Sequence, residues 1–457
     1  MTPAIDANAP TSTRICIDFG TALSKVSVCL DPDMPVTQGV RPLAIGAVSG
    51  AEHPLLTPSV MFVRGGRLHF GPSAFGHAAD SVDAERDALL SFKTVLGAEH
   101  AERALSEYLP PTIDPTGTLR ERDALVMYLA YLDQLILEAL RRSGAFPEGV
   151  ENAPRRFTSP VWKKNSVVER HMRAIFNEAA AVSTKLGKLL QAPEGISIAQ
   201  CRDALDKAAA NPGNARLDNG IFEPHAAAAT ALAFSREPAR FVVVFDIGAG
   251  TTDIAAFEFN ERLDPPIMSE IDEARQCSRL AGDEIDHVLI DLLLRKRGAK
   301  DNTVEKSRFQ RTCRIMARTL KRELFTTGKC SVKEAWRTTT LTQEELYEDP
   351  AFLHFIQLLG DLVKRSLTKV AQRAGPVDTI DVVLAGGGAM LPFLSGLVLE
   401  NAPDHLGRIK LRVEPLSPTS PLYEGIDPYF SDVFPQIAMS IGGALVELPP
   451  TNQGGGL

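Results

Sequence analysis

The chain has 457 residues, of which 44% are hydrophobic and 23% charged, so it can form roughly two to four domains with large cores. Its formal net charge of -8 provides no bulk attraction for a polyanion, so we expect no nucleic-acid partner. The six cysteines are scattered without a Cys-x-x-Cys pair, which favours reduced thiols over a zinc site or a disulfide framework.

The ends and the apolar stretches indicate where the protein resides. Met1 to Thr13 has no basic start followed by an apolar run, so no secretory signal is expected. The most apolar long stretch, Leu125 to Leu140, is interrupted by Asp133 and Glu138, which is typical of an amphipathic core helix rather than a membrane span. We therefore expect a soluble, cytoplasmic protein without membrane contact.

The first half of the chain begins with strands and continues with helices. A short β-branched run ends at Asp18, meets Gly20 and restarts at Lys25, which predicts two strands joined by a turn. Gly65-Gly66 separates two further apolar runs, 60–64 and 67–70, as in a tight hairpin. Helical patterns cover about 84–104, with a break at Gly97, and also 121–143 and 166–190. An insertion with a helical middle is expected at 183–220.

The second half repeats the opening pattern. The strongest predicted strand, Phe241 to Phe245, runs into Asp246-Ile247-Gly248-Ala249-Gly250-Thr251-Thr252-Asp253 and continues to Phe259. Mixed helix is expected from there to about Arg373, and a last strand leads into Gly386-Gly387-Gly388. Alternating strands and helices indicate an α/β fold. The Asp-x-Gly turns at Asp18 and Asp246 lie about half the chain apart, so two similar halves that face each other would explain them.

These turns have the chemistry of a phosphate site. Glycine lets backbone N–H groups approach an anion, and threonine adds a hydroxyl donor. Aspartate repels phosphate but can hold a hydrated Mg²⁺ that bridges phosphate oxygens. The glycines after the last strand allow a flat adenine or ribose to lie on the backbone. A Walker-type phosphate loop is absent from the sequence. The alternative is that each motif is only a hairpin turn with a solvated aspartate.

In order and spacing, these segments resemble the actin, sugar-kinase and DnaK-type chaperone superfamily. Further segments over about residues 14–447 are similar to the nucleotide-binding domain of the DnaK-type (70-kDa heat-shock) chaperones. They are Thr57-Pro58-Ser59-Val60, Phe92-Lys93-Thr94-Val95-Leu96-Gly97, Phe222-Glu223-Pro224-His225-Ala226-Ala227-Ala228, Ala281-Gly282-Asp283-Glu284-Ile285-Asp286 and Lys321-Arg322-Glu323-Leu324.

The resemblance implies a role for each matching residue. Asp18, Asp246 and Asp253 would position Mg²⁺, and Lys93, Glu223 and Asp246 would be the catalytic candidates, with Lys93 near the γ-phosphate and the two acids on the attacking water. The expected nucleotide-binding residues are Gly20, Thr21, Ala22, Gly248, Ala249, Gly250, Thr251, Gly282, Lys321, Arg322, Gly386, Gly387 and Gly388. The cofactors would be ATP or ADP with Mg²⁺.

Structural roles are the alternative for several of these residues. Lys93, Lys321 and Arg322 could be solvated surface charges, and Glu223 could cap the alanine-rich helix that follows it. His225 is expected to be packed or exposed rather than catalytic. Trp162 and Trp336 are expected to be packing residues.

The sequence also departs from the chaperone pattern. Met390 stands where the family has its adenine-stacking arginine, Arg318 where it has a helix acid, and Phe325 where it has a serine. Adenine recognition is therefore expected to differ. No acidic, leucine-containing linker and no β-sandwich peptide-binding domain follow the predicted nucleotide-binding part, so a chaperone cycle that docks such a domain is not expected on this chain alone.

The sequence thus predicts an actin-like ATPase fold with two lobes of duplicated, ribonuclease-H-like topology around a nucleotide cleft. The first lobe is expected at 1–238, with an outer subdomain at about 51–121, and the second at 239–457, with an outer subdomain at about 280–352. The predicted function is a slow ATPase that acts as a conformational switch on protein partners. The alternatives are a self-associating, filament-forming or scaffold ATPase, a kinase for a small acceptor, and a nucleotide-binding pseudo-enzyme.

Overall fold

The computed structural model describes residues 13–81, 86–97, 100–144, 146–159, 167–218, 220–260, 267–298, 303–334, 336–375, 378–403 and 409–445. Residues 1–12, in which no secretory signal is expected, and Trp162 lie outside these described residues. Within the described ranges, no helix combines the length and the apolar character needed to cross a membrane.

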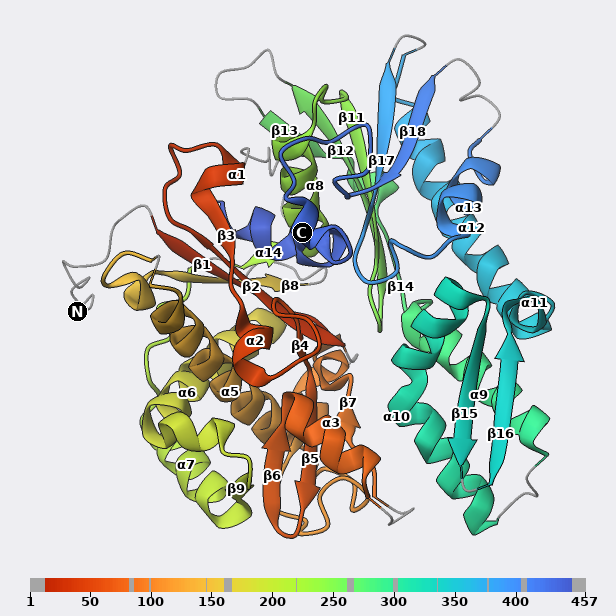
Figure 1. The fold of residues 1–457 in the computed structure, drawn as a ribbon. Coiled ribbons are helices and arrows are strands. Elements are labelled where there is room, and N and C mark those ends of the chain that lie inside the picture. The colour runs from red at the N-terminus through yellow and green to blue at the C-terminus, as the bar shows by residue number, and fades with distance from the viewer. Residues whose placement is uncertain are drawn as a thin grey trace.

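Two mixed sheets carry the fold, and they share one topology (Figure 1). In each sheet three successive strands pair antiparallel, and two later strands join in parallel beside the first of the three. The first sheet contains β1 (Arg14–Phe19), β2 (Leu23–Cys29), β3 (Val40–Pro42), β4 (Thr57–Pro58), β8 (Arg155–Ser159) and β10 (Ile221–Phe222). The second contains β11 (Phe241–Ile247), β12 (Thr252–Asn260), β13 (Ile267–Glu270), β14 (Gln276–Ser278), β17 (Thr379–Ala385) and β18 (Lys410–Pro415).

The matching strand orders are β3-β2-β1-β8-β10 and β13-β12-β11-β17-β18. This repetition confirms the predicted α/β fold of two duplicated, actin-like lobes. The residue boundaries proposed for the lobes and for their outer subdomains stay a prediction. Strand β11 is buried along its whole length, and its first five residues, Phe241 to Phe245, are all apolar rather than alternating.

Two helices lie between the sheets, α8 (Glu223–Phe234) and α14 (Phe434–Ala444) (Figure 1). Their side chains form one buried cluster with residues of both sheets, including Cys16 of β1 and Val244 of β11. The helices approach so closely that a Cβ on Gly442 would overlap the carbonyl oxygen of Ala226. The chain therefore returns at α14 to pack against the sheet with which it began.

The remaining elements extend each lobe away from the central helices. In the first lobe, the sheet β7-β5-β6-β9 adjoins a helical layer. The strands of this sheet are β5 (Val60–Arg64), β6 (Arg67–Phe70), β7 (Leu89–Leu90) and β9 (Ile196–Ser197). The other helices of the first lobe are α1 (Val36–Gly39), α2 (Ile45–Ser49), α3 (Gly71–Ala79), η1 (Phe92–Gly97), α4 (Ala101–Ser106), α5 (Glu121–Ser143), α6 (Val167–Leu186) and α7 (Ile198–Ala210). Helix α7 is the helical middle expected for the insertion.

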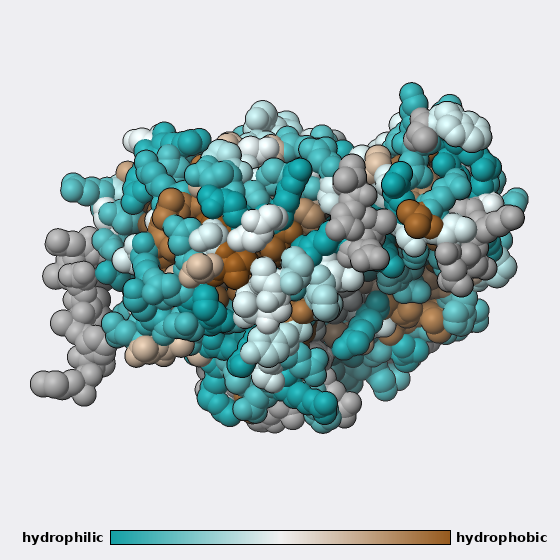
Figure 2. All heavy atoms as spheres, turned by 90° about the horizontal axis from the view of Figure 1, so that it is seen from below, coloured by the Kyte–Doolittle hydropathy of each residue, from teal (hydrophilic) through white to brown (hydrophobic). Residues whose placement is uncertain are grey.

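The second lobe carries the hairpin β15 (Lys329–Glu334) and β16 (Arg337–Thr342) together with helices. The helices are α9 (Gly282–Arg297), α10 (Val304–Thr327), α11 (Gln343–Tyr347), α12 (Pro350–Ala371) and α13 (Leu394–Glu400). The mixed helix expected up to Arg373 is interrupted by β13, by β14 and by this hairpin. The helical pattern expected over 84–104 is wrong at Leu89 and Leu90, which pair with β5. The break expected at Gly97 agrees with the structure, because η1 ends at Gly97 and α4 begins at Ala101. Seen from below, the surface is mainly hydrophilic, with apolar residues gathered in part of the view (Figure 2).

Candidate functional site

The first aspartate-glycine turn joins β1 to β2 and is closed by an ion pair. The strand register places Asp18 directly opposite Lys25, and the Lys25 Nζ lies 3.0 Å from Asp18 Oδ2. Thr158 of the neighbouring strand β8 donates its hydroxyl to Asp18 Oδ1 at 2.9 Å. Asp18 is 3% exposed, so its carboxylate is held almost entirely by protein groups rather than by bulk water.

The second turn, between β11 and β12, has the same register but a different pair of residues. Asp246 lies opposite Asp253, and both carboxylates are buried. Asp246 Oδ1 has no hydrogen-bond partner among the described residues. Burial, followed by the charges of Glu223, Asp253 and Asp18, raises the pKa of Asp246 well above its ordinary value. The protein alone therefore does not balance the negative charge of the carboxylates at this second turn.

The three glycines after β17 lie directly against the second turn. Gly386 has a φ of 78°, and a Cβ on it would overlap Asp246 Oδ1. The N–H of Gly388 donates to the carbonyl oxygen of Ile247 at 2.9 Å. Glycine is required at 386 both for the left-handed backbone and for the close approach of the aspartate.

The two turns also meet each other across the lobes. A Cβ on Gly250 would lie 3.3 Å from the Thr21 methyl and 3.1 Å from the Thr94 methyl. Because Thr21 and Thr94 belong to the first lobe and Gly250 to the second, the lobes are in contact at this point. The aspartate-glycine turns and the triple glycine thus converge, as the sequence predicts.

Lys93 and Glu223 form a buried ion pair beside these turns, with Nζ and Oε1 2.7 Å apart. Glu223 is the first residue of α8, and its side chain reaches η1 instead of capping its own helix. Burial raises the pKa of Glu223, and Lys93 offsets this only in part. Burial alone would lower the pKa of Lys93, but Glu223, Asp18 and Asp246 raise it overall, so the ammonium stays charged.

The residues expected on the adenosine side are connected to the second turn. The N–H of Gly282, at the start of α9, donates to the Gly248 carbonyl oxygen at 3.1 Å. Lys321 of α10 donates to the Gly282 carbonyl oxygen at 2.8 Å and pairs with Asp286. Arg322 is not part of this group. It is exposed and pairs with Glu52 at 3.3 Å.

Sequence reasoning missed two of the residues around Asp18. Lys25 follows from the hairpin register, because a symmetric pairing about the turn places residue 25 opposite residue 18. Thr158 lies 140 positions along the chain from Asp18 and has no local signal.

The charge balance of the site calls for a cation. Asp18, Glu223, Asp246 and Asp253 face Lys25 and Lys93, which leaves an excess of negative charge when all are ionised. In the part of the chain that the structure describes, no three His, Cys, Asp or Glu side chains are close enough to hold a metal by themselves.

Other residues singled out in the sequence have structural surroundings. His225 packs beside Phe257, and burial lowers its pKa to about 4, so the ring is neutral. Phe325 contacts Phe393 and Tyr347, while Met390 is 54% exposed.

The expectation that Trp336 is a packing residue is wrong, because its side chain is 91% exposed.

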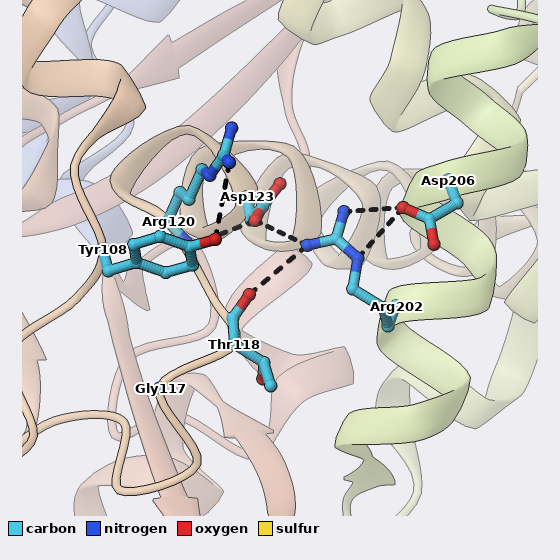
Figure 3. A pocket seen from close by; sticks show the side chains of 7 residues that line it. All are labelled: Tyr108, Gly117, Thr118, Arg120, Asp123, Arg202 and Asp206. Atoms are coloured by element: carbon cyan, nitrogen blue, oxygen red, sulfur yellow. Dashed lines mark hydrogen bonds and ion pairs between the residues drawn. The ribbon is translucent and has the colours of Figure 1, made fainter.

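A cavity of about 460 Å³ lies away from this cluster, in the first lobe between α7 and the start of α5 (Figure 3). Its charged side chains are paired with one another. Arg202 contacts Asp123 and Asp206, and Arg120 lies 5.0 Å from the centre of the Tyr108 ring. This self-neutralised cavity shares no residue with the predicted site.

The duplicated sheets and the paired turns define a protein of the actin-like ATPase fold. A family model described as "MreB/Mbl protein" matches residues 159–403, more than half of the chain, and the chain belongs to this family.

Chaperones are also similar to the chain. Chaperone protein HscA of Cronobacter sakazakii is 29% identical over 175 residues, covering 37% of this chain and 25% of that protein. Chaperone protein dnaK3 of Synechocystis is 30% identical over 189 residues, covering 39% of this chain and 23% of that protein. The chain thus spans about a quarter of the length of these curated relatives. The narrower assignment to the DnaK-type branch stays a prediction.

Proposed function

We propose that the protein binds ATP with Mg²⁺ in the cleft between its lobes, hydrolyses it slowly and acts as a conformational switch on protein partners in the cytoplasm. The observation that carries this proposal is the convergence of the two aspartate-glycine turns and the triple glycine around an excess of buried carboxylates. A divalent cation with a polyphosphate is the ligand that this combination of anionic side chains and backbone donors suits.

The first function of these residues would be to hold phosphates and metal. The turn residues Gly20 to Ala22 and Gly248 to Thr251 would present N–H groups and hydroxyls to phosphate oxygens. Asp18, Asp246 and Asp253 would hold the hydrated metal. When bound, Mg²⁺ would supply charge neutralisation for the phosphate oxygens.

The second function would be proton transfer and charge stabilisation. Asp246 and Glu223 would orient the attacking water and accept its proton, a role that suits carboxylates whose pKa is raised by burial. Lys93 would hold positive charge near the terminal phosphate, and its pairing with Glu223 fixes its position.

On the nucleoside side, Gly282, Lys321 and Gly386 to Gly388 would line the base and ribose, and Arg322 would reach them only by leaving Glu52.

Phosphate release from ATP tests the proposal. Glu223→Ala and Asp246→Asn should each lower turnover at least about 100-fold while ATP binding partly survives. Glu194→Ala, an exposed carboxylate far from the turns in sequence, should behave as wild type. Equal turnover in all four proteins would refute the catalytic assignments. Binding without turnover in the wild type would instead indicate a pseudo-enzyme.

A second candidate function is nucleotide-driven self-assembly, and the MreB/Mbl family match favours it. Sedimentation of the purified chain with and without ATP separates the two. A pellet that depends on ATP supports assembly, whereas turnover without a pellet supports the partner-directed switch.

A further inference from the structure

Arg318 is a buried arginine between the two lobes that the proposed function has not used. It lies on α10 of the second lobe, in the place where the chaperone-type pattern has an acid. Figure 1 shows α10 facing the strands and helix of the first lobe's outer part, and α10 contacts α3 there.

Helix α10 is fixed against the first lobe one and two turns before Arg318. The Arg311 guanidinium donates to the carbonyl oxygens of Ala78 and Ser81, the latter at 2.7 Å. Ile315 packs in a buried cluster with Val60 and Phe62 of the first lobe. Residues 311, 315 and 318 lie on one face of the helix, so these contacts determine where the Arg318 side chain is directed.

Arg318 itself crosses to the first aspartate-glycine turn. Its Nη1 donates to the carbonyl oxygen of Ala22 at 3.0 Å. The same oxygen accepts the N–H of Ser59 at 2.9 Å, so Ala22 is held from both lobes. Burial lowers the pKa of Arg318, and the charges of Asp283 and Asp286 on α9 oppose this, so the guanidinium remains charged.

Lys321, one turn further along α10, holds the adenosine-side loop through the Gly282 carbonyl oxygen. One helix therefore contacts the phosphate turn of the first lobe and the nucleoside loop of the second. The Ala22 carbonyl oxygen accepts hydrogen bonds from Ser59 and Arg318, so the arginine contacts the turn through a backbone oxygen.

We propose that Arg318 is a positioning residue, which fixes the first phosphate turn from the second lobe and so makes phosphate binding depend on the position of α10. This proposal rests on the proposed function for its effect on nucleotide, but not for its effect on the turn. It differs from the role implied by the chaperone resemblance, in which this helix position lies on the adenosine side.

The first test uses hydrogen exchange of the nucleotide-free, full-length protein. In Arg318→Met, the amides of residues 20–24 should exchange about tenfold faster, the effect of losing one charge-assisted hydrogen bond. Arg318→Lys keeps a cationic donor and should restore part of the protection. Arg308→Met, which removes an exposed arginine from the same helix, should leave the turn unchanged. Unchanged exchange at 20–24 in Arg318→Met would overturn the proposal.

The second test compares the affinities of ATP and adenosine by calorimetry. Arg318→Met should weaken ATP binding about tenfold and leave adenosine binding unchanged, because only the phosphate turn is loosened. An equal loss for both ligands would overturn the proposal and place Arg318 on the nucleoside. If the wild type binds neither ligand, the proposed function fails, and the exchange experiment still decides the role of Arg318.

Discussion

Replacing Asp246 with asparagine should stabilise the nucleotide-free protein while abolishing turnover. Asparagine has nearly the same shape but removes a buried negative charge that faces Asp253 and Glu223. The residue would thus be retained for its chemistry at a cost in stability, as is common at functional sites.

The gain in unfolding free energy from Asp246→Asn depends on pH, and its sign follows from the raised pKa of Asp246. In the unfolded chain Asp246 ionises near pH 4, whereas the folded pKa is well above this value. Between these two pKa values the unfolded state loses a proton that the folded state keeps, so wild-type stability falls as pH rises. The advantage of Asp246→Asn should grow by up to about 1.4 kcal/mol per pH unit, and level off above the folded pKa.

Urea unfolding of both proteins at several values between about pH 5 and pH 8, without metal or nucleotide, measures this difference. A difference in unfolding free energy that increases with pH supports the account. A constant difference, or a variant that is less stable than wild type throughout, would show that the Asp246 carboxylate is not strained in the empty site.

Two further substitutions test the structural framework. Asp114 accepts hydrogen bonds from the N–H groups of Thr118 and Leu119. Burial raises the pKa of Asp114, but these bonds and those from Thr116 lower the pKa overall. Asp114→Asn should therefore lower the unfolding free energy, measured in urea, by about 1–3 kcal/mol at neutral pH, and this loss should shrink as pH falls below about 4. Gly442→Ala should lower the unfolding free energy by about 1–3 kcal/mol, because its Cβ overlaps α8; unchanged stability would show that the two central helices can separate.

Much of the framework could be predicted because it rests on local patterns. Helix α5 and the hairpin β5-β6 have the predicted bounds, since each combines a regular apolar pattern with a glycine or polar boundary. The paired turns could be found because the same strand-Asp-x-Gly pattern occurs twice. Their convergence followed from the family resemblance and not from either motif alone.

The parts that could not be predicted depend on contacts between distant segments. The hairpin β15-β16 buries only one face, through residues such as Val332 and Leu341, and the charged residues of β15 weaken its strand signal. Leu89 and Leu90 are extended because β5 offers them a pairing edge. The link from Arg318 to Ala22 spans 296 positions, so the sequence showed the changed residue but not its new partner.

Calorimetric titration of ATP into the full chain, with Mg²⁺ and with a chelator, tests the central claim most directly. We predict binding with one nucleotide per chain that is strongly weakened without Mg²⁺ and weakened in the same way by Asp18→Asn. Absence of binding, or binding that neither the chelator nor Asp18→Asn changes, would contradict a metal-nucleotide site between the two turns.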